Sequence, residues 1–340
     1  MTAVPLRLFA ALALVGLGVV VTSTLILYNT TISIESEKVS ALSRSHARLI
    51  NSVTQFDSKH NDEYPLGGAR GATLSQIVDA HLEKIGFRKT GEYVLGEKSD
   101  ENIKFLIPSR IEGRAIAPVR LNAVAAEPMR RALLGTAGVM FAPDYRGKPV
   151  LAGYEPLPDL NGGFVAKIDV SEIREPFFYS ALLACLGAIV FSGLGCIAFF
   201  IVAKWLATSS GAQPAPDGGK RQNSIRLLAL VSCFTFVGVS SATSVIWLLY
   251  PQDIETQKSE LLSLSRGMAS LIDAVAMFDA ENTKGVGADG VIGATIAQVK
   301  AAAKYEPGFQ KTGEIVLGRS SGIEIQFLLP SRFTGKPPPP

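Results

Sequence analysis

Two arginines that close a repeated hexapeptide are the first candidates for chemistry in this sequence. FLIPSR ends at Arg110 and FLLPSR ends at Arg332, in each case after a predicted strand. A guanidinium group binds a carboxylate through two parallel N–H···O hydrogen bonds, so either arginine is a candidate for holding an anionic small molecule. The alternative is that each is a solvated charge on the surface.

Further polar candidates lie on the later predicted strands and turns, where a small-molecule pocket could form. Such pockets combine apolar and aromatic walls with a few convergent polar groups. A structural role is the alternative for each of these residues taken alone. The candidates are Arg120, Asp144, Tyr145 and Tyr154.

No motif in the sequence places a nucleophile beside a general base. GxSxG, HExxH and a P-loop are absent, and no GxGxxG follows a predicted strand. The net charge is only +3 and no basic stripe carries interleaved aromatic residues, which argues against nucleic-acid binding. The alternative of a membrane enzyme therefore has no supporting motif, and we expect no catalytic residues, metal or cofactor.

The hexapeptides belong to a tandem repeat in which every match has the same offset, 327 − 105 = 222 residues. A single offset without gaps indicates duplication of one unit, an apolar segment followed by a polar domain. The matched strings are ATLSQI (72–77) with ATIAQV (294–299), GFRKTGEYVLG (86–96) with GFQKTGEIVLG (308–318), and FLIPSR (105–110) with FLLPSR (327–332).

Composition indicates a membrane protein, because only 19 % of residues are charged, against roughly 25 % in soluble domains. A helix of about 20 apolar residues crosses the roughly 30 Å core of a bilayer. Three segments meet this condition, 8–28, 181–203 and 227–250. The first is predicted to be an uncleaved helix, because its apolar run exceeds that of a signal peptide and no A-x-A-like site closes it.

Charges beside the spans predict their orientation. The segment 204–226 carries Lys204, Lys220, Arg221 and Arg226 against one acidic residue, and it is rich in Gly, Pro and Ser. Positively charged flanks stay in the cytoplasm, so this segment is predicted to be a flexible cytoplasmic linker. Residues 29–180 and 251–340 are then predicted to be extracytoplasmic.

Apolar residues spaced three and four apart follow the first and third spans. One interpretation is a long amphipathic helix that lies on its own domain, and the other is a dimer seam that continues from the membrane. None of the three histidines aligns with a histidine in the other copy, which argues against a histidine-based site. The stripes are Val39, Leu42, His46, Leu49, Val53 and Phe56, and Leu261, Leu264, Met268, Leu271, Val275 and Phe278.

The rest of the first copy reads as an α+β domain. Helices are predicted over 73–85 and 127–134, the second with proline in its first turn, and a return helix begins within 171–177. Short apolar runs separated by turn signals predict antiparallel strands, and DYRGKP (144–149) predicts a turn between two of them. The runs are YVLG, IKFLI, GVMFA, PVLAGYEPL and FVAKIDV.

The order TGEYVLG, FLIPSR, PMRRALLG, DYRGKPVLAGYEPLP and GFVAKIDVSEI resembles the extracytoplasmic Cache-type, PAS-like sensor domains of bacterial receptors. The resemblance covers residues 30–178 fully and 252–336 in part. It implies a long N-terminal helix on an antiparallel sheet, and a pocket over the sheet for a small molecule such as a carboxylate or amino acid. We also expect a homodimer. The runner-up interpretation is a transporter-associated or structural membrane anchor with no sensing role.

The second copy stops early, since Pro340 aligns with Pro118. The later strands and the return span of the first copy have no counterpart in the 340 residues. We therefore expect two PAS-like domains, the second truncated, in a piece of a longer receptor. The missing part would complete the second copy, cross the membrane again and carry a cytoplasmic cyclase, diguanylate cyclase or histidine kinase.

Overall fold

The computed structural model describes residues 3–59, 68, 70–71, 73–74, 77, 87–209, 218–282, 295–296, 314, 316–321, 324–329, 331, 333–334 and 336. The chain divides into two compact units. One combines Met1–Ile32 with Ile173–Thr256, and the other combines Ser33–Glu172 with Gln257–Pro340. Most of the predicted helix 73–85 lies outside the described residues.

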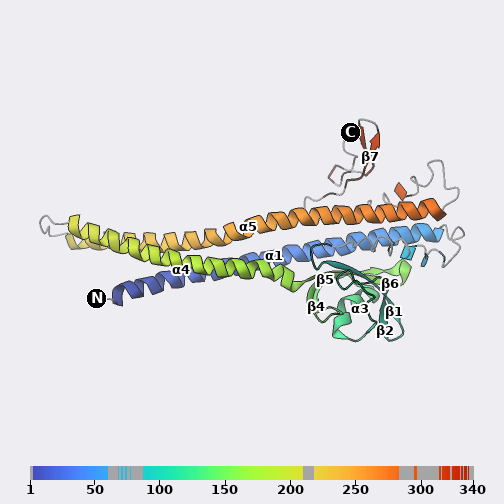
Figure 1. The fold of residues 1–340 in the computed structure, drawn as a ribbon, viewed down its shortest axis with the longest axis horizontal. Coiled ribbons are helices and arrows are strands. Elements are labelled where there is room, and N and C mark those ends of the chain that lie inside the picture. Colours follow the sequence, from blue (N-terminus) through green and yellow to red (C-terminus); the bar gives the residue numbers. More distant parts are fainter. Residues whose placement is uncertain are drawn as a thin grey trace. The chain divides into compact units, whose positions relative to one another are not determined.

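Three long helices dominate the chain, α1 (Ala3–Lys59), α4 (Val170–Ser209) and α5 (Gly218–Asn282) (Figure 1). Each contains one of the three predicted spans and is long and apolar enough to cross a membrane. This confirms the prediction of three apolar helices that suit a bilayer. Both α1 and α4 continue past their apolar segments without a break, so each helix runs from a span into the domain between them.

The predicted linker 204–226 is shorter than the sequence suggests. Helix α4 continues to Ser209 and α5 begins at Gly218, so helix occupies most of that segment. Once a helix is nucleated in a span, each further residue adds a hydrogen bond at little cost, and the Lys, Arg and Gln residues beside the spans favour helix. The Gly- and Pro-rich stretch 210–217 lies outside the described residues.

Small side chains let the apolar helices approach closely. A Cβ on Gly16 would lie 3.1 Å from Val237, 3.2 Å from Ala188 and 3.3 Å from Ser241. Packing of this kind holds helices together where lipid removes the hydrophobic driving force. The helices of this unit therefore meet along a seam of small residues.

The unit that contains Ser33–Glu172 is built on a six-stranded antiparallel sheet in the order β3-β2-β1-β6-β5-β4. The observed strands and the turn at 144–149 agree with the predicted runs, which confirms a mixed helix and antiparallel sheet fold. Membership of the Cache family stays a prediction. The strands are β1 (Glu92–Ser99), β2 (Asn102–Phe105), β3 (Val119–Arg120), β4 (Gly138–Pro143), β5 (Pro149–Leu157) and β6 (Gly162–Asp169).

One face of the sheet packs against α1. The imidazole of His46 lies 4.3 Å from the ring of Tyr93 and is stacked 5.9 Å from Phe164. At Gly153 the helix backbone comes so close that an added Cβ would lie 2.6 Å from the carbonyl oxygen of Val39. The stripe of the first copy therefore packs on its own sheet, as the first interpretation predicts.

The opposite face carries α3 (Glu127–Leu133), preceded by the short helix η2 (Val124–Ala126). Pro128 occupies the first turn of α3, where its missing N–H costs no hydrogen bond. Met129 and Ala132 of α3 face strand glycines, since a Cβ on Gly163 would lie 2.8 Å from Ala132. These glycines let α3 lie directly on the sheet.

A hairpin of the second copy repeats the geometry of the first. β7 (Gly318–Ser321) pairs with β8 (Glu324–Phe327) so that Gly318 faces Phe327, and β1 pairs with β2 so that Gly96 faces Phe105. The offset is again 318 − 96 = 222. Hydrogen bonds beyond the strands also correspond, since Leu106 N donates to Leu95 O as Leu328 N donates to Leu317 O. The repeat thus extends to the register of backbone pairing.

Candidate functional site

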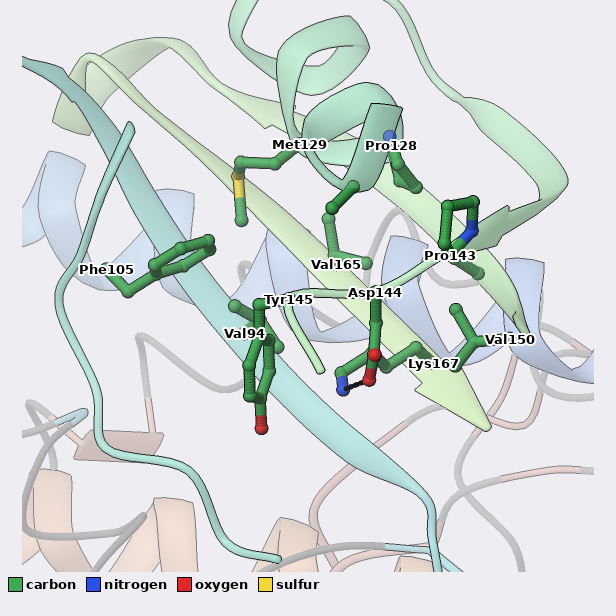
Figure 2. Close-up of a pocket in the computed structure, with 12 residues that line it drawn as sticks. Val94, Phe105, Pro128, Met129, Pro143, Asp144, Tyr145, Val150, Val165 and Lys167 are labelled. Atoms are coloured by element: carbon green, nitrogen blue, oxygen red, sulfur yellow. Dashed lines mark hydrogen bonds and ion pairs between the residues drawn. The ribbon is translucent and has the colours of Figure 1, made fainter. Parts of the chain in front are cut away.

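A pocket lies between α3 and the face of the sheet that points away from α1 (Figure 2). Its volume is about 30 Å³, which is room for about two water molecules. Most of its wall is apolar, and Figure 2 shows the polar side chains of Asp144, Tyr145 and Lys167 together at one end. The other lining residues are Val94, Phe105, Ala125, Pro128, Met129, Pro143, Val150, Ala152 and Val165.

The turn between β4 and β5 positions Asp144 and Tyr145. Asp144 N donates to Lys148 O at 2.9 Å, and Gly147 adopts a φ of +72°, which favours glycine. The carboxylate of Asp144 accepts the backbone N–H groups of Arg146 at 2.9 Å and Lys148 at 3.1 Å. The side chain of Asp144 is therefore fixed by its own turn and directed at the sheet.

Lys167 lies near the C-terminal end of β6 and is 3 % exposed. Its Nζ lies 2.8 Å from Oε2 of Glu92 and donates to Oδ2 of Asp144 at 2.5 Å. The same nitrogen lies 4.2 Å from the centre of the Tyr145 ring. An ammonium group has three N–H donors, so two carboxylates and one aromatic face account for all of them.

Glu92, the first residue of β1, is fully buried and accepts several hydrogen bonds. Ser109 Oγ lies 2.8 Å and Arg110 N 2.7 Å from its Oε1, and the Tyr145 hydroxyl lies 2.9 Å from its Oε2. Burial favours the neutral carboxyl. The charge of Lys167 and the hydrogen bonds from Lys167, Ser109 and Tyr145 outweigh burial and hold the pKa of Glu92 below its ordinary value.

The ion-pair network behind the polar end of the pocket carries more negative than positive charge. Arg146 donates to Asp144 at 2.7 Å and to Asp169, which adds a second cation and a third carboxylate to the group. Burial opposes ionisation of Asp144, but the hydrogen bonds and charges of Lys167 and Arg146 hold its pKa below the ordinary value. With all groups ionised, two cations face three carboxylates. Each of these groups has a partner, so the wall is an ordered polar network.

The structure brings two of the six predicted site residues to the pocket, Asp144 and Tyr145. Tyr154 is buried in the adjacent core on β5, and Arg120 is exposed on the edge strand β3, so neither lines the pocket. Arg332 lies outside the described residues.

Arg110 lies at a turn beside the sheet and not in the pocket wall. Its Nε donates to Gly91 O at 2.9 Å, and its Nη2 donates to Gly91 O and Lys89 O, both at 2.7 Å. These contacts tie the FLIPSR segment to the turn that precedes β1. In the structure the partners of Arg110 are backbone carbonyl groups, and its role in binding a carboxylate stays a prediction.

Lys167 and Glu92 are not among the site residues that the sequence predicts. A signal for Lys167 exists, because a lysine interrupts the apolar run FVAKIDV. A charged side chain on a strand that is buried on both faces requires a partner of opposite charge. That signal identifies a buried ion pair but not its partners.

Among the described residues, no three or more His, Cys, Asp or Glu side chains are grouped to hold a metal ion. No protein-family model, curated protein or solved structure matches the chain.

Proposed function

We propose that this chain is the sensory region of a bacterial inner-membrane receptor that binds a small molecule outside the cytoplasm. The sheet domain would be periplasmic, and the signal would pass to a cytoplasmic cyclase, diguanylate cyclase or histidine kinase. The observation that carries the proposal is the continuity of β6 with α4. Lys167 lines the pocket, Asp169 ends the strand, and Val170 begins the helix that contains the second apolar span.

No loop separates β6 from α4, so a flexible segment cannot absorb a displacement of the strand. A shift of the strand at the pocket is a shift of the first turn of α4, and displacements of about 1–2 Å between helices are sufficient in switching proteins. The ligand can favour one arrangement only by binding it more tightly than the other. An anchor without a sensing role would need no pocket at this junction.

The lining of the pocket favours a small, uncharged and largely apolar ligand. Lys167 and Asp144 form an ion pair with each other. The network behind them carries a surplus of negative charge, which disfavours the carboxylate ligand predicted from Arg110. A volume of about 30 Å³ admits no metabolite as it stands. Binding therefore requires α3 to move outwards, and the unbranched side chain of Met129 lets that wall adapt.

A binding screen on the full chain in nanodiscs tests this proposal. Small uncharged compounds should raise the unfolding temperature, because a ligand of the folded state stabilises it in proportion to its occupancy. Ala125→Leu fills the pocket and should abolish the shift, while Ala117→Leu makes the same change at an exposed position and should keep it. A ligand whose shift survives Ala125→Leu would bind elsewhere and would contradict this site.

A further inference from the structure

The turn formed by residues 88–91 contacts both helices that leave the sheet domain. On the α1 side, Nη2 of Arg88 lies 2.7 Å from Oε1 of Glu35. The two side chains are only 10 % and 5 % exposed, so water screens this ion pair little. Lys38, one turn further along α1, lies 3.1 Å from the same oxygen.

On the α4 side, the turn meets Glu172, an acidic residue in the first turn of the helix. Oε2 of Glu172 accepts hydrogen bonds from Thr90 N at 2.8 Å and from Thr90 Oγ1 at 2.5 Å, and Oε1 accepts one from Lys89 N at 3.1 Å. Thr90 Oγ1 in turn accepts from Asp169 N at 3.1 Å. One threonine thus binds both the last residue of β6 and the first turn of α4.

The turn itself has little freedom to move. A Cβ on Gly91 would lie 1.6 Å from Phe87 O, so only glycine fits, and Arg88 adopts a φ of +57°. The guanidinium of Arg110 donates to Gly91 O and Lys89 O from the other side. The next residue is Glu92, which accepts hydrogen bonds from the polar wall of the pocket.

We propose that the 88–91 turn is the joint that fixes the beginning of α4 relative to α1 within the sheet domain, with Arg88 and Thr90 as its positioning residues. The geometric part of this inference is independent of any ligand. Its use in signalling rests on the proposed function, because a ligand that displaces Tyr145 or Lys167 acts on the joint through Glu92.

The second copy of the repeat contains an informative change at this joint. Lys-Thr-Gly-Glu is identical in both copies, but Gln310 stands at the position of Arg88 and Gln257 at that of Glu35. Both members of the ion pair are replaced together. The double variant Arg88→Gln/Glu35→Gln therefore gives the first copy the uncharged pair that the chain already carries.

Spin-label distances in the full chain test the joint directly. The three native cysteines are replaced by alanine, and labels are attached at Glu37→Cys on α1 and Ser171→Cys on α4, both exposed positions. In nanodiscs without ligand, Arg88→Gln and Glu35→Gln should each broaden the distance distribution. The double variant should broaden it by less than the sum of the two single changes, because each single change already removes the Arg88–Glu35 pair; Glu35→Gln also removes the contact with Lys38.

Variants of Thr90 test the contact between the 88–91 turn and α4. Thr90→Val keeps the shape of the side chain but removes the hydroxyl, and it should broaden the distribution. Thr90→Ser keeps the hydroxyl and should show the narrow distance distribution of the parent protein. Arg114→Gln removes an exposed guanidinium that forms an ion pair with the nearby Glu112, and it is the matched control that should change nothing.

A second label pair at Lys98 and Lys148, both exposed on the sheet domain, reports whether the sheet remains folded. The inference is overturned if that pair is unchanged while Arg88→Gln and Thr90→Val leave the helix distances narrow. It is also overturned if the effects of Arg88→Gln and Glu35→Gln add. Failure of the ligand screen would contradict the proposed function alone, because these distances are measured without ligand.

Discussion

Glu92 shows how one buried side chain can join the pocket to the rest of the domain. It is fully buried, yet its two oxygens are shared by an ammonium group, a backbone N–H and two hydroxyl groups. A buried carboxylate without such partners would be protonated or would destabilise the fold. The network therefore depends on the ionised form of Glu92, and its stability should depend on pH.

We predict that Glu92→Gln destabilises the folded sheet domain by about 3 kcal/mol at pH 7. The change keeps the size of the side chain but removes the charge that balances Lys167, and breaking a buried ion pair costs about 3–5 kcal/mol. Unfolding temperatures of the full chain measure the effect. Glu112→Gln makes the same change in an exposed pair and should stay within about 0.5 kcal/mol of the parent.

The stability difference between the parent protein and Glu92→Gln should depend on pH with a known sign. The pKa of Glu92 is lowered in the folded state, so its contribution is present above the ordinary value of 4.5 and is lost as pH falls through the folded-state value. The parent should therefore lose stability more steeply below about pH 4.5 than Glu92→Gln. Parallel acid titrations of the two proteins would contradict a role for the charge.

At the scale of elements, the sequence predicts those features that local signals determine. Pro128 lies in the first turn of α3, Gly147 has the positive φ that the 144–149 turn requires, and the apolar runs form strands. The sequence predicts Asp144 and Tyr145 as pocket residues but not Lys167. Lys167 contacts Asp144, which lies 23 residues away in the sequence, and no local pattern encodes that contact. For the same reason the backbone carbonyl partners of Arg110 could not be predicted.

Glycines in the strands decide how closely the helices approach the sheet, and Gly153 provides the sharpest test. Its added Cβ would lie 2.6 Å from Val39 O, which is backbone and cannot yield alone, so α1 must move. We predict that Gly153→Ala destabilises the domain by about 1–3 kcal/mol, the usual cost of overpacking. Thermal unfolding of the full chain, followed by circular dichroism, measures it.

Gly113→Ala is the matched control for Gly153→Ala. Gly113 has a φ of +68° and nothing within 4 Å of its added Cβ, so its cost is backbone strain of about 1 kcal/mol. In addition, only Gly153→Ala should change the distance between labels on α1 and on the sheet. An unchanged distance together with an unchanged unfolding temperature would mean that α1 does not rest on this strand.

At the scale of the whole molecule, the repeat suggests two domains of the same kind on one side of the membrane. The hairpins β1–β2 and β7–β8 share their register, while the ion pair at the 88–91 turn has no charged counterpart in the second copy. Equal backbone pairing with unequal charges is typical of duplicated units whose roles have diverged. Two domains that sense the same compartment must both be exported, and three apolar helices make this testable.

We predict that reporter fusions at residues 60, 212 and 300 read outside, inside and outside. Helices α1, α4 and α5 are each long and apolar enough to cross once, and three crossings bring the second copy back to the side of the first. The 204–226 segment is predicted to lie in the cytoplasm because four basic residues flank spans two and three closely: Lys204, Lys220, Arg221 and Arg226.

Substitution of the basic residues beside the spans tests whether their charge sets the topology. Replacing Lys220, Arg221 and Arg226 with Gln should weaken the inside reading at residue 212, because these charges set the orientation of the flanking spans. Three equivalent replacements at Lys98, Lys104 and Arg114, within the sheet domain, should leave all readings unchanged. An inside reading at residue 300 in the unmodified chain would mean that α5 does not cross. The second copy would then face the cytoplasm, where it could not sense the same compartment as the first.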